Sequence, residues 1–191
     1  MTAQINDAFR YGKREYAVAG ISEGKLFEPS LLDLKPAANC TACWRGYQAV
    51  FAVLESRLIL DTLHVNLEEA KGPMINGIAP APPKKGLDLF NNHYLGLKYH
   101  LEYSGGLLLA AGFIESLYVH MGFHPAWKYK TVIELVFDGG ILKQEFDRSE
   151  RMAEIREMIS KSQEKESSSG MPSEAEIRQF VERAFDRSYR M

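Results

Sequence analysis

Alternation of apolar and polar side chains along short segments is the feature that most constrains the fold of this chain. Leu97, Tyr99, Leu101 and Tyr103 occupy every second position, with polar side chains between them. Successive side chains of a β-strand point to opposite faces, so this pattern predicts a half-buried strand whose aromatic face lies in the core. Gly106 to Ala111 is predicted to be the next strand and to pair with it.

The strongest hairpin pattern lies later in the chain. Lys130 to Phe137 and Ile141 to Phe146 have strand composition and flank Asp138-Gly139-Gly140. Glycine adopts the positive φ angles that a tight hairpin turn requires, so this segment is predicted to be a β-hairpin. Glu15 to Ile21 and Phe113 to Met121 are also predicted to be strands.

A second hairpin is predicted in the first third of the chain. Gly46 to Leu54 and Arg57 to Leu67 are rich in Val, Leu, Ile and Phe, and Glu55-Ser56 separates them. In the second arm, the side chains predicted to face inward stand at even-numbered positions up to Leu60 and at odd-numbered positions from Leu63. A β-bulge near Asp61-Thr62 would restore the burial pattern, because one extra residue on one strand shifts the phase of those that follow.

These segments give about seven strands, joined mostly by connections too short for the helical crossover that a parallel pair requires. Helical periodicity begins only after residue 147, where Met152, Ile155 and Ile159 recur at helical spacing. The chain is therefore predicted to be an α+β protein, a predominantly antiparallel β-sheet or open barrel with C-terminal helices.

The sequence predicts one β-rich domain over residues 1–160 that ends in a helix, because 191 residues are enough for one good core. Residues 161–172 include a run of serines and a glycine, which predicts a flexible linker. Residues 173–191 are predicted to be an amphipathic helix, with Ser173 and Glu176 as a capping box. This C-terminal helix is expected to cover the sheet or to dock on a second copy of the chain, giving a homodimer.

Charge and composition argue against several classes of partner. Lysine and arginine number 23 against 25 acidic side chains, so the chain has no net positive field to attract nucleic acid. The most apolar run, Gly105 to Ile114, is about half as long as a membrane-spanning helix, and the N-terminus has no secretory signal. Two cysteines are compatible with a reducing compartment. We expect a cytoplasmic protein without nucleic-acid or membrane partners.

Cys40 and Cys43 have the spacing of a thiol redox centre or of half a zinc site. A strand rather than a helix is predicted to follow them, which is atypical of redox catalysis. His120 and His124 would have to supply the other two zinc ligands from a distant segment. We favour instead two small side chains packed beside Trp44, and we expect no cofactor.

The segment from Tyr118 to Tyr129 is the densest group of aromatic and imidazole side chains in the chain. Tyr118 and His120 are predicted to share the outer face of a strand, with His124 and Trp127 in the turn beyond it. Aromatic rings with polar groups are favoured at recognition surfaces, so these four side chains are predicted to form a binding surface. The alternative is a second small core beneath a long loop.

A second candidate site is Trp44-Arg45-Gly46-Tyr47, which combines a guanidinium group with two aromatic rings. Arg45 and Tyr47 are predicted to bind a ligand, with Arg45 holding a carboxylate or a phosphate through its planar fork. The alternative is an arginine that stacks on neighbouring rings or closes a surface ion pair.

The sequence has no Gly-x-Ser-x-Gly elbow, no Walker-type phosphate loop, no dinucleotide-binding fingerprint and no His-Glu-x-x-His motif. We therefore predict a non-catalytic module that binds a small ligand or a protein partner. The alternative is a hydrolase-like or metal-dependent enzyme, in which His120 or His124 acts with a carboxylate or with Cys43.

Trp44-Arg45-Gly46-Tyr47 and Tyr118-Val119-His120-Met121-Gly122 resemble segments of an uncharacterised family of small bacterial proteins. The resemblance covers residues 10–160 and implies a bacterial, cytoplasmic setting. It implies no activity, ligand or catalytic residue.

Overall fold

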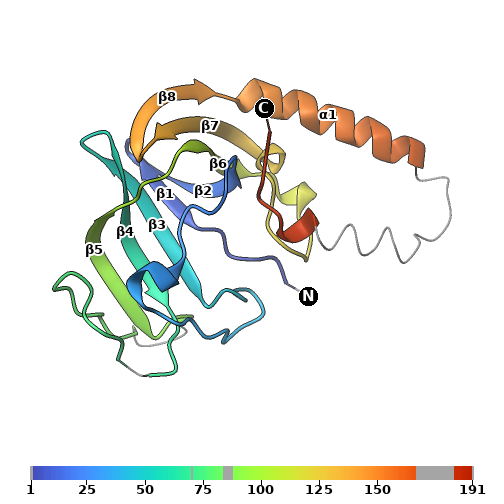
Figure 1. Cartoon of the computed structure of the whole chain (residues 1–191). Helices are drawn as coiled ribbons and strands as arrows, with labels where there is room; N and C mark the ends of the chain where they lie inside the picture. The colour runs from blue at the N-terminus through green and yellow to red at the C-terminus, as the bar shows by residue number, and fades with distance from the viewer. Residues whose placement is uncertain (1, 70, 84–87, 167–182, 191) are drawn as a thin grey trace.

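The computed structural model describes residues 2–69, 71–83, 88–166 and 183–190, with side chains as far as residue 161 in the helix that ends at 166. The described part holds eight β-strands, one α-helix and three short 3-10 helices (Figure 1). The strands are β1 (Ala8–Tyr11), β2 (Arg14–Ile21), β3 (Tyr47–Leu54), β4 (Arg57–Val65), β5 (Asn92–His100), β6 (Gly105–Phe113), β7 (Tyr129–Asp138) and β8 (Ile141–Asp147). The helices are η1 (Pro29–Leu32), η2 (Glu115–Leu117), η3 (Ala126–Lys128) and α1 (Ser149–Glu166).

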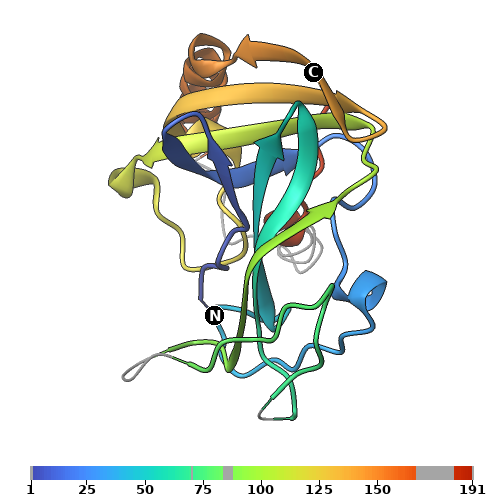
Figure 2. The ribbon, with the colours of Figure 1, turned by 90° about the vertical axis from the view of Figure 1, so that its left-hand side faces the viewer.

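All eight described strands belong to one mixed sheet in the order β3-β1-β2-β6-β7-β8-β4-β5. The sheet closes on itself, because β3 pairs with β4 as well as with β1 (Figure 2). The β1–β3 pair is parallel, and the other pairs of these strands are antiparallel. The prediction of an α+β protein built on a mainly antiparallel sheet is confirmed.

The main core lies inside the closed sheet, where strands from all sides direct large side chains inward. Phe9, Phe51, Tyr94, Leu109 and Leu135 are among its completely buried members. Burial of an apolar side chain of this size contributes about 1.5–3 kcal/mol, so this interior is the main source of stability.

Both predicted hairpins form with the predicted turns. Gly139 and Gly140 have φ angles of 53° and 75° and connect β7 to β8. Glu55 and Ser56 also adopt positive φ angles, 49° and 62°, between β3 and β4. The register of β4 shifts against β3 and against β5 at Asp61-Thr62, so the predicted bulge is confirmed.

Three expectations about strands are wrong. The short strand β1 was not predicted, and it introduces the parallel pair. Gly106 to Ala111 pairs with β2 and β7 instead of the Leu97 strand. After β5 the chain stays extended against the β7–β8 turn, where the N–H of Gly140 donates to the carbonyl of Tyr103 at 2.8 Å. This contact separates β5 from β6, so the two consecutive strands do not form a hairpin.

The third error concerns Phe113 to Met121, which is not a strand. The chain leaves the sheet at Phe113 and forms η2 and an irregular loop. Gly112, with a φ angle of 71°, marks the departure. Side-chain alternation in this segment therefore does not separate an inner from an outer face.

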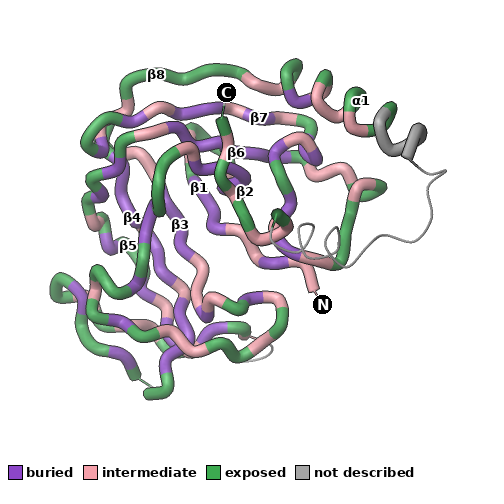
Figure 3. Tube along the Cα trace, turned by 45° about the vertical axis from the view of Figure 1, so that its right-hand side comes forward, coloured by how far each residue is buried: buried purple, intermediate pink, exposed green. Residues whose placement is uncertain are grey.

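Helix α1 packs on the outer face of the sheet, where Met152 and Ile155 meet the outward side chains of Ala19, Leu108 and Val132. Among the helix residues whose side chains are described, Met152 is buried, and the others are intermediate or exposed (Figure 3). Asp147 accepts the backbone N–H of Ser149 at 2.8 Å and stabilises the first turn. Among the described residues, no helix combines the length and the apolar character needed to cross a bilayer.

The predicted linker over residues 161–172 and the predicted helix over 173–191 lie largely outside the described residues. Of their described parts, 161–166 continue α1, residues 183–185 are helical, and residues 186–190 belong to no helix or strand but form one β-bridge, between Ser188 and Ile21. The homodimer expected through this helix stays a prediction.

The C-terminal segment, residues 183–190, runs back over the sheet and is fixed there by hydrogen bonds. Phe123 N–H donates to the carbonyl of Ala184 at 2.7 Å, and Ile21 N–H donates to the carbonyl of Arg187 at 2.9 Å. The ring of Phe185 stacks on Trp44, with 5.0 Å between ring centroids. These contacts hold the C-terminal segment against three distant parts of the chain.

Glycines make room for the C-terminal segment. A Cβ atom on Gly122 would collide with the carbonyl of Ala184, and one on Gly106 would collide with the hydroxyl of Tyr189. Gly122 also has a positive φ angle of 65°. Gly122 is therefore required both for its positive φ angle and for its lack of a Cβ atom, and Gly106 for its lack of a Cβ atom.

Replacing Gly122 by alanine should displace the C-terminal segment. The matched control is Gly12→Ala, because Gly12 has a similar φ angle of 60° and has no atom within 4 Å of a Cβ at that position. Both variants carry backbone strain of about 1–2 kcal/mol, and G122A should lose roughly 1–3 kcal/mol more through the collision. Urea unfolding measures this difference, and trypsin should cleave after Arg187 faster in G122A. Equal losses in the two variants would contradict the described docking.

Candidate ligand-binding cavity

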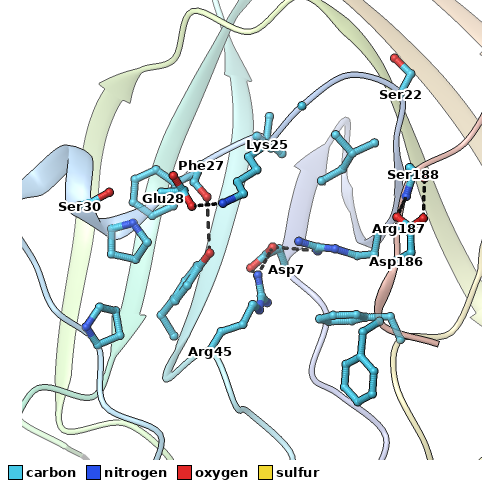
Figure 4. A pocket seen from close by; sticks show the side chains of 18 of the residues that line it. Asp7, Ser22, Lys25, Phe27, Glu28, Ser30, Arg45, Asp186, Arg187 and Ser188 are labelled. Atoms are coloured by element: carbon cyan, nitrogen blue, oxygen red, sulfur yellow. Dashed lines mark hydrogen bonds and ion pairs between the residues drawn. The ribbon is translucent and has the colours of Figure 1, made fainter. Parts of the chain in front are cut away.

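A cavity of about 650 Å³ lies between the loop that follows β2, the entrance to β3 and the C-terminal segment. The loop supplies apolar side chains such as Leu26 and Phe27, which are buried and belong to the main core. Asp7, Arg45 and Arg187 converge in the cavity wall (Figure 4). The cavity thus combines an apolar wall with a cluster of charges.

Asp7 is the centre of this charged cluster, and its side chain is only 5% exposed. Arg45 donates to both carboxylate oxygens, from Nη1 to Oδ2 at 2.8 Å and from Nη2 to Oδ1 at 3.0 Å. Nη1 of Arg187 donates to Oδ2 at 2.9 Å, and the backbone N–H of Ala49 donates to Oδ1 at 3.0 Å. Each oxygen of this buried carboxylate therefore accepts two hydrogen bonds.

Electrostatic interactions keep the cluster ionised. Burial alone would raise the pKa of Asp7, but Arg45 and Arg187 outweigh burial and lower that pKa below its ordinary value. Burial would lower the pKa of Arg45, and the nearby Asp7 carboxylate raises it instead. Since an arginine stays charged in proteins, two positive charges face one negative charge.

Aromatic rings hold both guanidinium groups in place. Cζ of Arg187 lies 4.7 Å from the centroid of the Phe123 ring, and Cζ of Arg45 lies 5.3 Å from the same centroid. Cζ of Arg45 is also 4.6 Å from the centroid of the Tyr47 ring. Such cation–π contacts restrict the guanidinium planes without neutralising their charge.

The other charged side chains that line the cavity, Lys25, Glu28 and Asp186, are exposed. Lys25 Nζ lies 2.5 Å from a carboxylate oxygen of Glu28. The carboxylate of Asp186 accepts the backbone N–H of Ser188 at 2.7 Å and its hydroxyl at 2.8 Å. Solvent screens exposed pairs, so the buried cluster around Asp7 dominates the electrostatic potential inside the cavity.

Of the residues predicted to bind a ligand, Arg45 and Tyr47 line this cavity. Tyr118, His120 and His124 lie together in a separate aromatic cluster. The ring of Tyr118 is 4.7 Å from that of His120 and 5.2 Å from that of His124, measured between centroids. The two candidate groups found in the sequence therefore occupy different places.

Trp127 belongs to neither group. It is partly buried and packs against the small outer core beneath α1. Arg156 of α1 donates from Nε to the carbonyl of Trp127 at 2.8 Å. This residue attaches the loop to the helix.

His124 is the electrostatically unusual member of the aromatic cluster. It is 8% exposed, and both ring nitrogens are buried without a hydrogen-bond partner. Its ring lies 4.7 Å from that of Phe113, measured between centroids. Burial, helped by the nearby Lys128 ammonium, lowers the pKa of His124 to about 4, so the imidazole is neutral at neutral pH.

The cysteines are both free thiols. Cys43 is buried and donates from Sγ to the carbonyl of Tyr47 at 3.3 Å. Burial raises the pKa of the Cys43 thiol, which opposes formation of a reactive thiolate. Within the described residues, which include Cys40, Cys43, His120 and His124, no three His, Cys, Asp or Glu side chains are grouped to hold a metal ion.

Of the residues at the charged cluster, sequence reasoning missed three: Asp7, Phe123 and Arg187. Asp7 precedes a strand that was itself not predicted, and Arg187 lies in a segment read as helix. Phe123 was part of the recognised aromatic segment but was assigned to no binding surface. Asp7 and Arg187 could have been identified only from evidence that the two ends of the chain are in contact.

Fold and cavity together define an α+β protein with a closed mixed sheet and a charged, apolar-walled cavity beside it. No protein-family model, no curated protein and no solved structure matches the chain. The resemblance to an uncharacterised bacterial family therefore stays a prediction.

Lowering the pH from 6.5 to 4 should destabilise the protein through His124. The folded protein keeps this imidazole neutral down to a pKa of about 4, whereas an unfolded chain protonates it below an ordinary pKa of 6.5. Unfolding therefore binds a proton within this window, and the free energy of unfolding falls with pH by roughly 3 kcal/mol or less.

Urea unfolding at several pH values measures this loss in the wild type and in His124→Phe. The matched control is His120→Phe, because His120 belongs to the same cluster but is exposed. H124F should flatten the pH dependence between 4 and 6.5 and H120F should not. Parallel pH profiles for wild type and H124F would refute the assignment.

Proposed function

We propose that this protein is a non-catalytic binding module for small amphipathic anions, which it takes into the cavity beside Asp7. The observation that carries this proposal is the convergence of two guanidinium groups on one buried carboxylate in an aromatic wall. A net positive charge at a partly buried position favours a negatively charged ligand group.

Arg187 is the residue proposed to contact the anion. Both terminal nitrogens of Arg45 already donate to Asp7, and Nη2 also donates to the carbonyl of Ile5 at 3.3 Å. Among the described residues, Arg187 donates only to Asp7 and only through Nη1. Its remaining N–H groups suit a carboxylate or phosphate oxygen.

The apolar wall suits the body of such a ligand. Leu26, Phe27, Leu34 and Tyr47 line the cavity together with Phe123. A volume of about 650 Å³ falls within the range of cavities that enclose small organic molecules. An acyl chain or an aromatic acid would satisfy both the apolar wall and the charged cluster.

We place this binding module in the bacterial cytoplasm. The sequence resemblance supports this, and so do the two free cysteines, which are compatible with a reducing compartment. The enzyme alternative finds less support. In the described residues, His124 has no hydrogen-bonded carboxylate, which a general base of the hydrolase type would use for orientation. We therefore favour binding over hydrolysis.

Decanoate should bind the full-length protein, and decanol, which has the same chain length without the charge, should bind much more weakly. Isothermal titration calorimetry measures both. Arg187→Gln should weaken decanoate binding about tenfold or more, because a hydrogen bond to a charged group contributes roughly 1.5–3 kcal/mol. Equal affinities for decanoate and decanol would refute anion recognition.

The matched control is Arg190→Gln, which removes an exposed arginine of the same segment that does not line this cavity. R190Q should bind decanoate as the wild type does. Arg187→Lys keeps the positive charge but loses the planar fork, so it separates charge from geometry. Urea unfolding without ligand identifies any variant that has simply lost stability.

A further inference from the structure

Cys40 and Cys43 are the first and last residues of a tight turn that ends two residues before Arg45. The backbone N–H of Cys43 donates to the carbonyl of Cys40 at 3.3 Å. A turn closed in this way holds its first and fourth Cα atoms less than about 7 Å apart. Disulfides join cysteines whose Cα atoms are about 4.4–6.8 Å apart. The backbone of this turn is therefore compatible with a bond between the two sulfur atoms.

The two thiols have different surroundings. Cys40 is partly exposed, whereas Cys43 is buried and donates from Sγ to the carbonyl of Tyr47 at 3.3 Å. Burial is the main reason that the pKa of Cys43 is raised, and although Arg45 opposes this effect, a charge on Cys40 adds to it. Cys40 is therefore the thiol that a reagent in solution reaches first, and Cys43 is the neighbouring thiol that can react second.

Hydrogen bonds join the turn to the N-terminal segment that leads to the charged cluster. The N–H of Ile5 donates to the carbonyl of Ala42 at 2.9 Å, and Nε2 of Gln4 donates to the carbonyl of Thr41 at 2.8 Å. Just after the turn, the N–H of Trp44 donates to Oε1 of Gln4 at 3.0 Å. A movement of the turn therefore moves the N-terminal segment with it or breaks these bonds.

The residues that follow the turn reach the cavity directly. Trp44 stacks on Phe185 of the C-terminal segment, and Arg45 holds both oxygens of the carboxylate at the centre of the cluster. A disulfide has no S–H group, so closing it removes the hydrogen bond from Cys43 to the Tyr47 carbonyl and draws Cys43 toward the other sulfur. The two residues that follow Cys43 must adjust to this change.

We propose that Cys40 and Cys43 form a redox-regulated modification site, at which a small organic disulfide closes the Cys40–Cys43 bond and thereby weakens anion binding in the cavity beside Asp7. The effect on binding rests on the function proposed above, whereas formation of the bond does not. Disulfides of cytosolic proteins are usually transient and include redox-sensing ones, which agrees with two thiols that are free in the reduced protein.

Two thiol–disulfide exchanges form the bond. The Cys40 thiolate attacks one sulfur of the small disulfide and breaks its S–S bond, which releases one small thiol and leaves a mixed disulfide on Cys40. Sγ of Cys43 gives its proton to solvent and attacks Sγ of Cys40, which breaks the mixed disulfide and releases the second small thiol. Two protein thiols are thus oxidised to one disulfide, and the small disulfide is reduced to two thiols.

Oxidised glutathione and mass spectrometry of the full chain test the order of these steps. The wild type should lose two hydrogens and retain no glutathione. Cys43→Ser should retain one glutathione on Cys40, because no second thiol displaces it. Cys40→Ser should gain glutathione at least about tenfold more slowly, because burial disfavours the Cys43 thiolate. A lasting glutathione adduct on the wild type, or equal rates in the two variants, would overturn the proposal.

Calorimetry with decanoate tests the regulation. The oxidised wild type should bind decanoate about tenfold more weakly than the reduced protein, a loss comparable to that of one hydrogen bond to a charged group. Dithiothreitol should restore the affinity. The matched control is reduced Cys40→Ser, which cannot form the internal bond and should bind as the reduced wild type does, before and after a short exposure to oxidised glutathione.

The two proposals fail in different ways. Equal affinities of the oxidised and reduced wild type would overturn the regulation and leave the proposed function standing. Absence of decanoate binding by the reduced protein would refute the proposed function together with its regulation, and the mass spectra would still decide whether the Cys40–Cys43 bond forms.

Discussion

The buried carboxylate of Asp7 is the interaction on which the rest of the structure depends. Its partners Arg45, Ala49 and Arg187 lie 38, 42 and 180 residues away in the sequence. A carboxylate buried without partners would cost several kcal/mol, so the N-terminus, the start of β3 and the C-terminal segment stabilise one another through Asp7. Because two guanidinium groups face one carboxylate, this buried cluster carries one net positive charge.

A second buried carboxylate holds the C-terminal segment two residues further along, at Tyr189. Glu134 of β7 accepts Nε of Arg148 at 2.8 Å and the hydroxyl of Tyr189 at 2.6 Å. Burial raises the pKa of Tyr189, and its hydrogen bond to Glu134 raises it further, so the phenol stays a donor. Because Asp7 and Glu134 hold residues only two positions apart, the C-terminal segment is a fixed wall of the cavity.

The local part of this fold could be predicted from sequence, and the long-range part could not. Alternation and the Gly139-Gly140 turn identified the hairpins, because both signals lie within a few residues of each other. Arg45 stood out because two aromatic rings are its neighbours in the chain. Asp7 and Arg187 gave no such signal, since their roles exist only once the sheet has closed and brought the chain ends together.

In the aromatic segment between β6 and β7, composition indicated a binding site but did not predict the backbone conformation. A strand would have placed alternate side chains on two faces, whereas η2, η3 and the loop between them turn neighbouring residues in different directions. Phe123 consequently supports the guanidinium groups of the cavity, and His124, the next residue, packs with Phe113 near Lys128. One dense stretch of rings therefore serves two separate environments, one positively charged and one apolar, and the irregular backbone is what divides them.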